Sequence, residues 1–156
     1  MPHQLIDTDM RVLWHPFAQQ KDYETNPPLL IRSAKGAQLF DESGKAYYDT
    51  FSSWWCNVHG HGHPYLLEAL RTQSESMQHI MFSGLSHEPG IRLAERLIDL
   101  APSNMDRVFY SDNGSTSVEV ALKMSVQYWK DQGTQKHRFI HLENGYHGDT
   151  AAAMSV

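Results

Sequence analysis

Apolar residues recur at helical spacing along three stretches of the chain. The stretches cover residues 64–80, 88–100 and 114–129, and the first two begin close to a proline, which the first turn of a helix tolerates. Gly133 is placed to end the third helix. The pattern therefore predicts three amphipathic helices. The expected stripe of the first consists of Leu67, Leu70, Ser74, Met77 and Ile80.

Short β-branched and aromatic runs predict a small β-meander ahead of these helices. Its expected strands are 29–31, 37–40 and 46–48, with Ser43-Gly44 as the turn between the last two. Residues 1–28, punctuated by prolines, and residues 51–64, rich in Ser, Trp, His and Gly, are expected to be irregular.

Strand-like runs also flank the third helix, at 108–111 and 138–142. A strand–helix–strand unit connects by a right-handed crossover, so the two strands are expected to be parallel neighbours. Ligands in such sheets bind beyond the carboxyl ends of the strands, where the polar loops 111–116 and 143–150 follow. The residues expected around this one site are Gly114, Ser115 and Tyr146.

The start of the third helix predicts an anion site. Asp112-Asn113-Gly114 is a turn, and Gly114-Ser115-Thr116 then opens the helix. The first N–H groups of a helix lack partners and carry about half a positive charge, which suits a phosphate. An ordinary N-cap is the alternative, because Ser and Thr are common there.

Composition narrows the class of protein. The 156 residues are enough to form one domain with a core. The formal net charge is −5 and the sequence has no basic run, so no surface suited to nucleic acid or to an anionic membrane is expected. The single cysteine, Cys56, excludes a disulfide framework and suits a reducing compartment, so a cytoplasmic location is expected. The apolar run 151–156 has no cap or turn after it, which suggests a piece of a longer protein.

The run from His59 to His63 places three imidazoles within five residues. A catalytic zinc usually takes three protein ligands, but no acidic or cysteine companion lies close in the sequence. The interpretation is therefore a turn without a metal. Cys56 is interpreted as a packed thiol and not as a nucleophile.

Three motifs, together with these loops, carry a family resemblance. They are Leu13-Trp14-His15-Pro16-Phe17, Ser52-Ser53-Trp54-Trp55 and Asn144-Gly145-Tyr146-His147-Gly148-Asp149-Thr150. From about Leu13 onward the chain resembles the class III pyridoxal-phosphate aminotransferases, and most closely their biotin-biosynthesis branch. It resembles the N-terminal third or so of the family's usual length.

The resemblance implies an α/β protein with the fold of type I pyridoxal-phosphate enzymes. Residues 1–62 would form the N-terminal arm and β-meander of the small domain. Residues 63–156 would begin the cofactor-binding large domain and its mainly parallel sheet, which is incomplete here. It also implies a homodimer that acts on small molecules, with no nucleic-acid or membrane partner.

The resemblance also implies residue roles. Gly114 and Ser115 match the positions that hold the phosphate of pyridoxal 5'-phosphate, and Tyr146 matches the aromatic residue that stacks on the pyridine ring and lines the substrate pocket. Trp54 matches a substrate-contacting residue, with Trp55 beside it on the pocket wall. His147 and Asp149 would support the loop around Tyr146.

The implied reaction is transamination of 8-amino-7-oxononanoate to 7,8-diaminononanoate. Phe17 also lies in the substrate pocket, where many members have a tyrosine. A phenylalanine at this position is found in members that use lysine as the amino donor, whereas Trp54 and Trp55 resemble the members that use S-adenosylmethionine. The two signals disagree, so both donors remain open, and S-adenosylmethionine is the favoured one. No lysine of this chain stands in the context of the family's Schiff-base lysine, so no catalytic residue is expected in it.

Two other functions remain open on the sequence. One is another class III ω-aminotransferase, acting on ornithine, 4-aminobutyrate or a polyamine. The other is a short interaction module without catalysis, although such a module should cover its exposed sheet edges.

Overall fold

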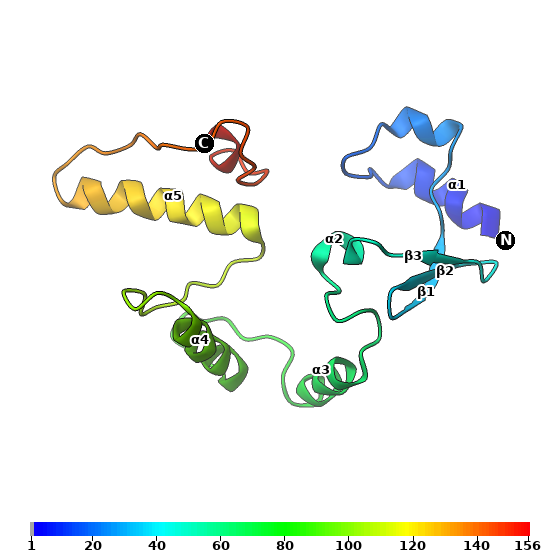
Figure 1. Ribbon diagram of the computed structural model, residues 1–156, viewed down its shortest axis with the longest axis horizontal. Helices are drawn as coiled ribbons and strands as arrows, with labels where there is room; N and C mark the ends of the chain where they lie inside the picture. The colour runs from blue at the N-terminus through cyan, green and yellow to red at the C-terminus, as the bar shows by residue number, and fades with distance from the viewer. Residues whose placement is uncertain (1) are drawn as a thin grey trace. The chain divides into compact units, whose positions relative to one another are not determined.

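A computed structural model describes residues 2–156. They divide into two compact units, of which the first ends at Ile80 and the second is Met81–Val156 (Figure 1). The sequence predicted a domain boundary earlier, between residues 62 and 63. The observed division leaves helix α3 (Pro64–Ser76) with the first unit.

The first unit is built on a three-stranded antiparallel meander, as the sequence predicted. Its strands are β1 (Ile31–Lys35), β2 (Gln38–Asp41) and β3 (Ala46–Tyr48), in that order. The first strand was expected at 29–31 but begins only at residue 31. The register explains the shift: pairing is anchored at the tight turn, where Lys35 faces Gln38 and Gly36 takes a φ of 57°. A strand is defined by its partner, and the apolar run alone does not locate it.

The turn between β2 and β3 is held by the carboxylate of Asp41. Its Oδ1 accepts bonds from the Ser43 N–H at 2.8 Å and from the Lys45 N–H at 3.0 Å, and its Oδ2 accepts the Tyr47 hydroxyl at 3.0 Å. The Ser43 hydroxyl also donates to Asp41 and is the largest cause of a lowered Asp41 pKa. The predicted Ser43-Gly44 turn is confirmed, with Gly44 at a φ of 85°.

The irregular structure expected over 1–28 was wrong, because this segment contains helix α1 (Pro2–Val12) and the short 3-10 helix η1 (Gln20–Glu24). The prolines do not interrupt α1: one stands at its first position, which needs no N–H donor, and Pro16 lies beyond its end. The Asp9 carboxylate of α1 contacts His15 Nε2 at 2.7 Å.

Helix α3 is shorter than its apolar stripe predicted. It ends at Ser76, since Met77 is extended and its carbonyl accepts a bond from the Gln73 side chain at 3.0 Å. Met77 and Ile80 therefore lie outside the helix.

The second unit contains the two other predicted helices, α4 (Glu88–Leu100) and α5 (Gly114–Asp131). Gly133 follows α5 with a φ of 70°, the left-handed conformation typical of a helix end. The chain then returns along α5 and closes in the 3-10 helix η2 (Ala153–Ser155), which packs against α5 (Figure 1).

The parallel strand pair expected on either side of α5 does not form. Residues 108–111 and 138–142 are in no sheet, and β1–β2–β3 is the only sheet within residues 2–156. Parallel strands are stable only when they pair and are covered on both faces, and the described residues supply no neighbouring strand for either run.

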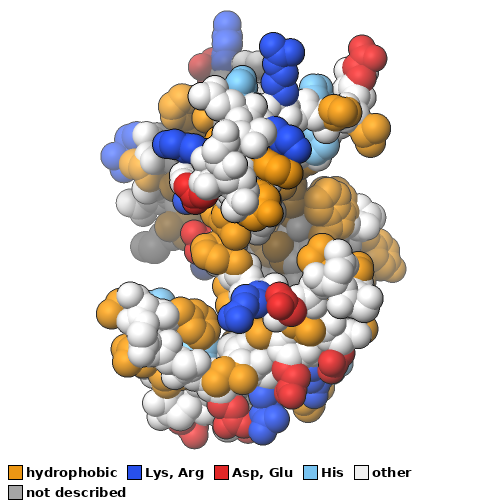
Figure 2. Space-filling view, turned by 90° about the vertical axis from the view of Figure 1, so that its left-hand side faces the viewer, with side chains coloured by type: hydrophobic (Ala, Val, Ile, Leu, Met, Phe, Trp, Pro, Cys, Tyr) orange, Lys and Arg blue, Asp and Glu red, His pale blue; other side chains and the backbone are white. Residues whose placement is uncertain are grey.

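The expected core is also missing. Ala153 is the only buried hydrophobic residue in the described part of the chain. Large apolar side chains lie uncovered on the face shown in Figure 2, and the helix stripes include exposed Leu67, Leu70 and Leu97. Within residues 2–156, no helix is long and apolar enough to cross a membrane.

Candidate functional site

The N-terminus of α5 is fixed by a reciprocal cap. The Asn113 side chain accepts the Thr116 N–H at 3.0 Å, and the Thr116 hydroxyl accepts the Asn113 N–H at 3.2 Å. Ser111 donates to the same hydroxyl at 2.6 Å. These bonds use the amide of Thr116 and leave those of Gly114 and Ser115 without a bond to the described residues. Two N–H groups are thus available at the positive end of the helix.

The backbone of Gly114 is open to an approaching group. A Cβ placed on Gly114 would meet no heavy atom within 4 Å, and its φ is not left-handed. The protein itself therefore does not require glycine at this position. Open space beside two unpaired N–H groups fits a phosphate.

The loop 143–150 is docked on this helix end. The Asp149 N–H donates to Ser115 Oγ at 3.0 Å, and the Thr150 hydroxyl oxygen lies 3.4 Å from the Ser115 carbonyl oxygen. Gly148 has a φ of 126°, and a Cβ there would lie 2.7 Å from the Ser115 Cα. The loop and the helix end can approach this closely because residue 148 has no side chain.

The Tyr146 side chain is presented from this docked loop. Its hydroxyl donates to Asp149 Oδ2 at 2.6 Å, which is the largest cause of a raised Tyr146 pKa. The side chain is 72% exposed, so its ring is available to a ligand. Asp149 holds the tyrosine hydroxyl with its carboxylate and the helix with its N–H, so Tyr146 is tied to Ser115 through one residue.

Glu119 anchors the far end of the loop and was missed in the sequence. Its Oε2 accepts the Thr150 hydroxyl at 2.6 Å, the Ala152 N–H at 3.1 Å and the Ala153 N–H at 3.2 Å. The hydrogen bond from Thr150 is the largest cause of a lowered Glu119 pKa. The available signal was spacing: Glu119 lies four residues after Ser115, on the same face of α5.

His147 is part of the same loop but does not join its network. Its Nε2 is the one buried side-chain nitrogen or oxygen without a hydrogen-bond partner in the described residues. A Cβ on Gly145 would lie 2.7 Å from that atom, so the loop backbone covers the ring.

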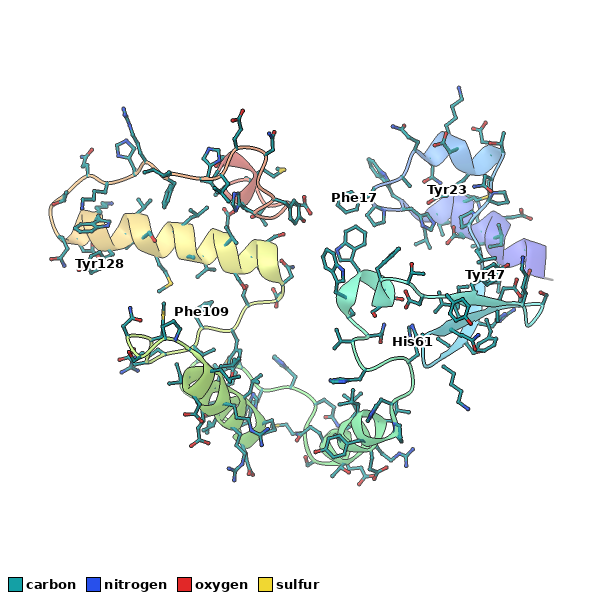
Figure 3. The ribbon with its side chains drawn as sticks, viewed as in Figure 1. Phe17, Tyr23, Tyr47, His61, Phe109 and Tyr128 are labelled. Carbon is teal, nitrogen blue, oxygen red and sulfur yellow. The ribbon has the colours of Figure 1, made fainter. Side chains whose placement is uncertain are left out.

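A cluster of aromatic side chains forms separately in the first unit. Phe17, labelled in Figure 3, stacks on Trp54 with ring centroids 5.2 Å apart and an interplanar angle of 25°. The Trp54 and Trp55 rings are 6.1 Å apart and tilted by 57°. Trp54 is 57% exposed. The two motifs that carried the resemblance, 13–17 and 52–55, therefore meet in the structure.

The turn that carries the tryptophans has an unusual backbone. Residues 51–64 were expected to be irregular, but Ser52–Trp55 forms one helical turn, α2, whose four residues have φ values of 53°, 48°, 66° and 62°. Left-handed helical backbone costs roughly 1–2 kcal/mol per residue for side chains other than glycine. Such a turn persists only where the surrounding structure holds it, and backbone strain of this kind clusters at functional sites.

The carboxylate of Asp49 holds this turn. It accepts the Ser53 N–H at 2.8 Å and the Ser53 hydroxyl at 2.7 Å. His61 Nε2 lies 2.8 Å from Asp49 Oδ2. The Ser53 hydroxyl is the largest cause of a lowered Asp49 pKa, followed by the Ser53 N–H and His61.

The contact between His61 and Asp49 corrects the sequence analysis, which found no acidic companion for the histidines. His59 and His63 lie together instead, with ring centroids 5.9 Å apart. In the described part of the chain, no group of three or more His, Cys, Asp or Glu residues could hold a metal ion. Cys56 was expected to be packed but is exposed.

The six predicted site residues therefore fall into two groups, one in each unit. Residues Gly114, Ser115 and Tyr146 gather at the start of α5, through the docked loop and not through a parallel sheet. Residues Phe17, Trp54 and Trp55 gather at α2.

Comparison with known proteins gives a consistent picture. Residues 19–156 match the family described as aminotransferase class-III. The chain is 49% identical to adenosylmethionine-8-amino-7-oxononanoate aminotransferase of Anoxybacillus flavithermus, over 97% of this chain and 33% of that protein. It is 45% identical to the protein of the same name from Staphylococcus aureus, over 98% of this chain and 35% of that protein. The chain spans about a third of the length of the curated relatives it matches.

Solved structures agree. The structure of adenosylmethionine-8-amino-7-oxononanoate aminotransferase from Methanocaldococcus jannaschii matches with a TM-score of 0.95 at 38% identity, over 100% of this chain and 36% of that chain. An omega transaminase from Pseudomonas jessenii, solved in complex with PMP, matches with a TM-score of 0.90 at 32% identity, over 97% of this chain and 34% of that chain.

Proposed function

Because the chain belongs to the class-III aminotransferases, we propose that the whole protein transfers an amino group to 8-amino-7-oxononanoate and yields 7,8-diaminononanoate. The observation that carries the proposal is the docking of the Tyr146 loop on the start of α5, where the Asp149 N–H binds Ser115 Oγ at 3.0 Å. This contact brings a helix end with two unpaired N–H groups together with an exposed aromatic ring, which supports binding of a phosphorylated aromatic cofactor. The names of the relatives supply the substrate.

The cofactor of this family is pyridoxal 5'-phosphate, and the residues at the start of α5 fit it. In the proposal the N–H groups of Gly114 and Ser115 bind its phosphate, and Tyr146 lies against the face of its ring. The bond from the Tyr146 hydroxyl to Asp149 fixes the outer end of the side chain and thereby the position of the ring. When bound, pyridoxal phosphate supplies the electron sink through which an amino group is exchanged.

We propose that the second group of residues binds the substrates. The stacked rings of Phe17 and Trp54, with Trp55 beside them, offer an apolar wall suited to the aliphatic chain of 8-amino-7-oxononanoate. The same aromatic surface suits the adenine ring of S-adenosylmethionine, which we propose as the amino donor in preference to lysine.

The remaining proposals concern the setting of the enzyme. We propose a homodimer, as the family implies, located in the cytoplasm, where the exposed thiol of Cys56 stays reduced. Its partners would be small-molecule substrates only.

Incubation of the whole protein with pyridoxal phosphate, 8-amino-7-oxononanoate and one donor at a time tests the function. Mass spectrometry is expected to detect 7,8-diaminononanoate with S-adenosylmethionine. Formation of 7,8-diaminononanoate with lysine and not with S-adenosylmethionine would refute the proposed amino donor. Activity toward 4-aminobutyrate or ornithine, and none toward the oxononanoate, would refute the substrate and favour another class-III transaminase.

A further inference from the structure

Four consecutive left-handed residues are not explained by the packing of their own side chains. The φ values of residues 52–55 lie between 48° and 66°, yet none of the four is glycine. Trp54 and Trp55 are both exposed, so burial of the indoles does not offset the strain. Some other interaction must hold the turn.

Asp49 provides that interaction. Its side chain is 6% exposed and binds both the N–H and the hydroxyl of Ser53, at 2.8 and 2.7 Å. The backbone bonds of the turn lie at its ends. The Ser52 N–H donates to the Asp49 carbonyl at 3.4 Å and the Trp55 N–H to the Phe51 carbonyl at 2.8 Å, and the Ser52 carbonyl accepts the N–H groups of Cys56 and Asn57. The carboxylate thus makes two short bonds to the middle of the turn, where the Cys56 thiol adds only a long contact to the Trp54 carbonyl at 3.5 Å.

Asp49 is itself fixed to the sheet from two sides. Its N–H donates to the Ala37 carbonyl at 3.0 Å, next to β2. On its other side, His61 contacts the carboxylate at 2.8 Å and pairs its own backbone with Gly36, through bonds of 2.8 and 2.9 Å. Figure 3 shows His61 beside the strands, on the segment of chain that leads to α3. The carboxylate therefore connects the sheet to the turn 52–55 and fixes one relative to the other.

We propose that Asp49 is a positioning residue for the substrate site: it holds the left-handed turn 52–55 and thereby keeps the Trp54 indole stacked on Phe17. This inference rests on the proposed function, since it assigns the aromatic wall to the substrate. Asp49 acts through Trp54 and does not touch the substrate. His61 supports Asp49 in that role.

The test uses Asp49→Asn in the whole protein. The amide replaces one acceptor oxygen by a donor, so it cannot accept both Ser53 bonds and the His61 contact. We expect kcat/KM for the oxononanoate to fall by about ten- to a hundredfold, the loss expected when a binding group is misplaced by about 1 Å. The loss is expected mainly in KM, with pyridoxal phosphate still retained.

Asp41→Asn is the matched control. Asp41 is also an aspartate of this sheet that accepts several bonds from a turn, including a serine N–H at 2.8 Å and a serine hydroxyl at 2.6 Å. It holds the β2–β3 turn instead of the aromatic turn. Its replacement is expected to lower stability while KM for the oxononanoate stays unchanged.

A double-mutant cycle separates positioning from general destabilisation. If Asp49 acts through Trp54, then Asp49→Asn adds little to the loss already caused by Trp54→Ala; additive losses would overturn the inference. Should Asp49→Asn not fold, Ser53→Ala removes one of the same bonds and is expected to raise KM in the same direction. An unchanged KM in a folded variant would also overturn it.

Different measurements would refute the proposed function and the role of Asp49. Absence of wild-type activity toward the oxononanoate refutes the function. Near-UV circular dichroism of the tryptophans then still decides whether Asp49 holds the turn: loss of their signal in Asp49→Asn, but not in Asp41→Asn, supports that role, and an unchanged signal overturns it.

Discussion

Gly114 gives the most direct test of the cofactor site, because the protein around it tolerates a side chain. A Cβ at this position meets no heavy atom within 4 Å, and the residue opens α5 with a φ that any residue adopts. Replacing a helix glycine by alanine at such a site stabilises a protein by about 0.4–1 kcal/mol through the unfolded chain. Gly114→Ala is therefore expected to leave the free energy of unfolding of the cofactor-free protein unchanged or raised.

Binding of pyridoxal phosphate should respond in the opposite direction. The phosphate is proposed to approach the N–H groups of Gly114 and Ser115, and hydrogen bonds to charged groups contribute about 1.5–3 kcal/mol each. Loss of one such bond corresponds to roughly a ten- to hundredfold rise in Kd, since each 1.4 kcal/mol is about tenfold. We expect that range for Gly114→Val and a smaller rise for Gly114→Ala.

Kd is measured by titration of the cofactor-free whole protein with pyridoxal phosphate, followed by absorbance, beside chemical unfolding of each variant. Ser117→Val is the matched control: it places the same side chain at an exposed position of the same helix end, on a residue whose own N–H is already bonded to Asn113. It also removes the bond from the Ser117 hydroxyl to the Asn113 carbonyl at 2.9 Å, and the unfolding curve of this variant measures that loss. An unchanged Kd in a stably folded Gly114→Val protein would refute the site. Equal weakening in Ser117→Val would show that the effect is not local.

Three further predictions concern the aromatic wall, the loop anchor and the assembly. Trp54→Ala is expected to lower kcat/KM for the oxononanoate at least as much as Asp49→Asn does, by about ten- to a hundredfold. It is expected to cost less stability than the roughly 3–5 kcal/mol of a buried aromatic truncation, because Trp54 is 57% exposed. Phe17→Tyr should keep the ring stacked on Trp54 and change kcat/KM for the oxononanoate little. Single-turnover kinetics with each amino donor checks both variants. The pKa of Glu119 is lowered in the fold, chiefly by the bond from Thr150, so its stabilisation is full above its ordinary pKa of 4.5 and is lost as pH falls through the lowered folded value. Glu119→Gln should therefore flatten the acid limb of a stability–pH curve, and an unchanged limb would contradict this role. Sedimentation of the whole protein is expected to show a dimer; a fully active monomer would refute it.

Helices with both a periodic stripe and a punctuating residue could be predicted from the sequence alone. α4 and α5 begin where they were predicted to begin, and Gly133 follows α5 in the left-handed conformation. These signals are local: a stripe, a cap and a glycine act within a few residues of each other. The end of α3 was predicted too late because no glycine or proline marks it: Met77 is extended, and the Gln73 side chain donates to its carbonyl.

Strands were less predictable than helices. The meander was found because tight turns bring its partners close in sequence, whereas the runs at 108–111 and 138–142 form no strand within the described residues. Aromatic and aliphatic residues are present in both cases. Whether such a run becomes a strand depends on a neighbour to pair with, which composition does not report.

In the candidate site, too, local motifs could be predicted from the sequence and long-range contacts could not. The sequence alone determined which residues are candidates for the site, since the polar turn before α5, the loop with Tyr146 and the tryptophan pair are each recognisable as short motifs. Only the tertiary structure decided how these motifs are held. The loop that carries Tyr146 is bonded to Ser115 at one point and to Glu119 at its C-terminal end. The left-handed turn that contains Trp54 is held by Asp49, which His61 contacts in turn. The reason is physical. Residue types and their spacing define which groups are available, but a hydrogen bond between residues 12 or 34 positions apart forms only once the chain between them has folded.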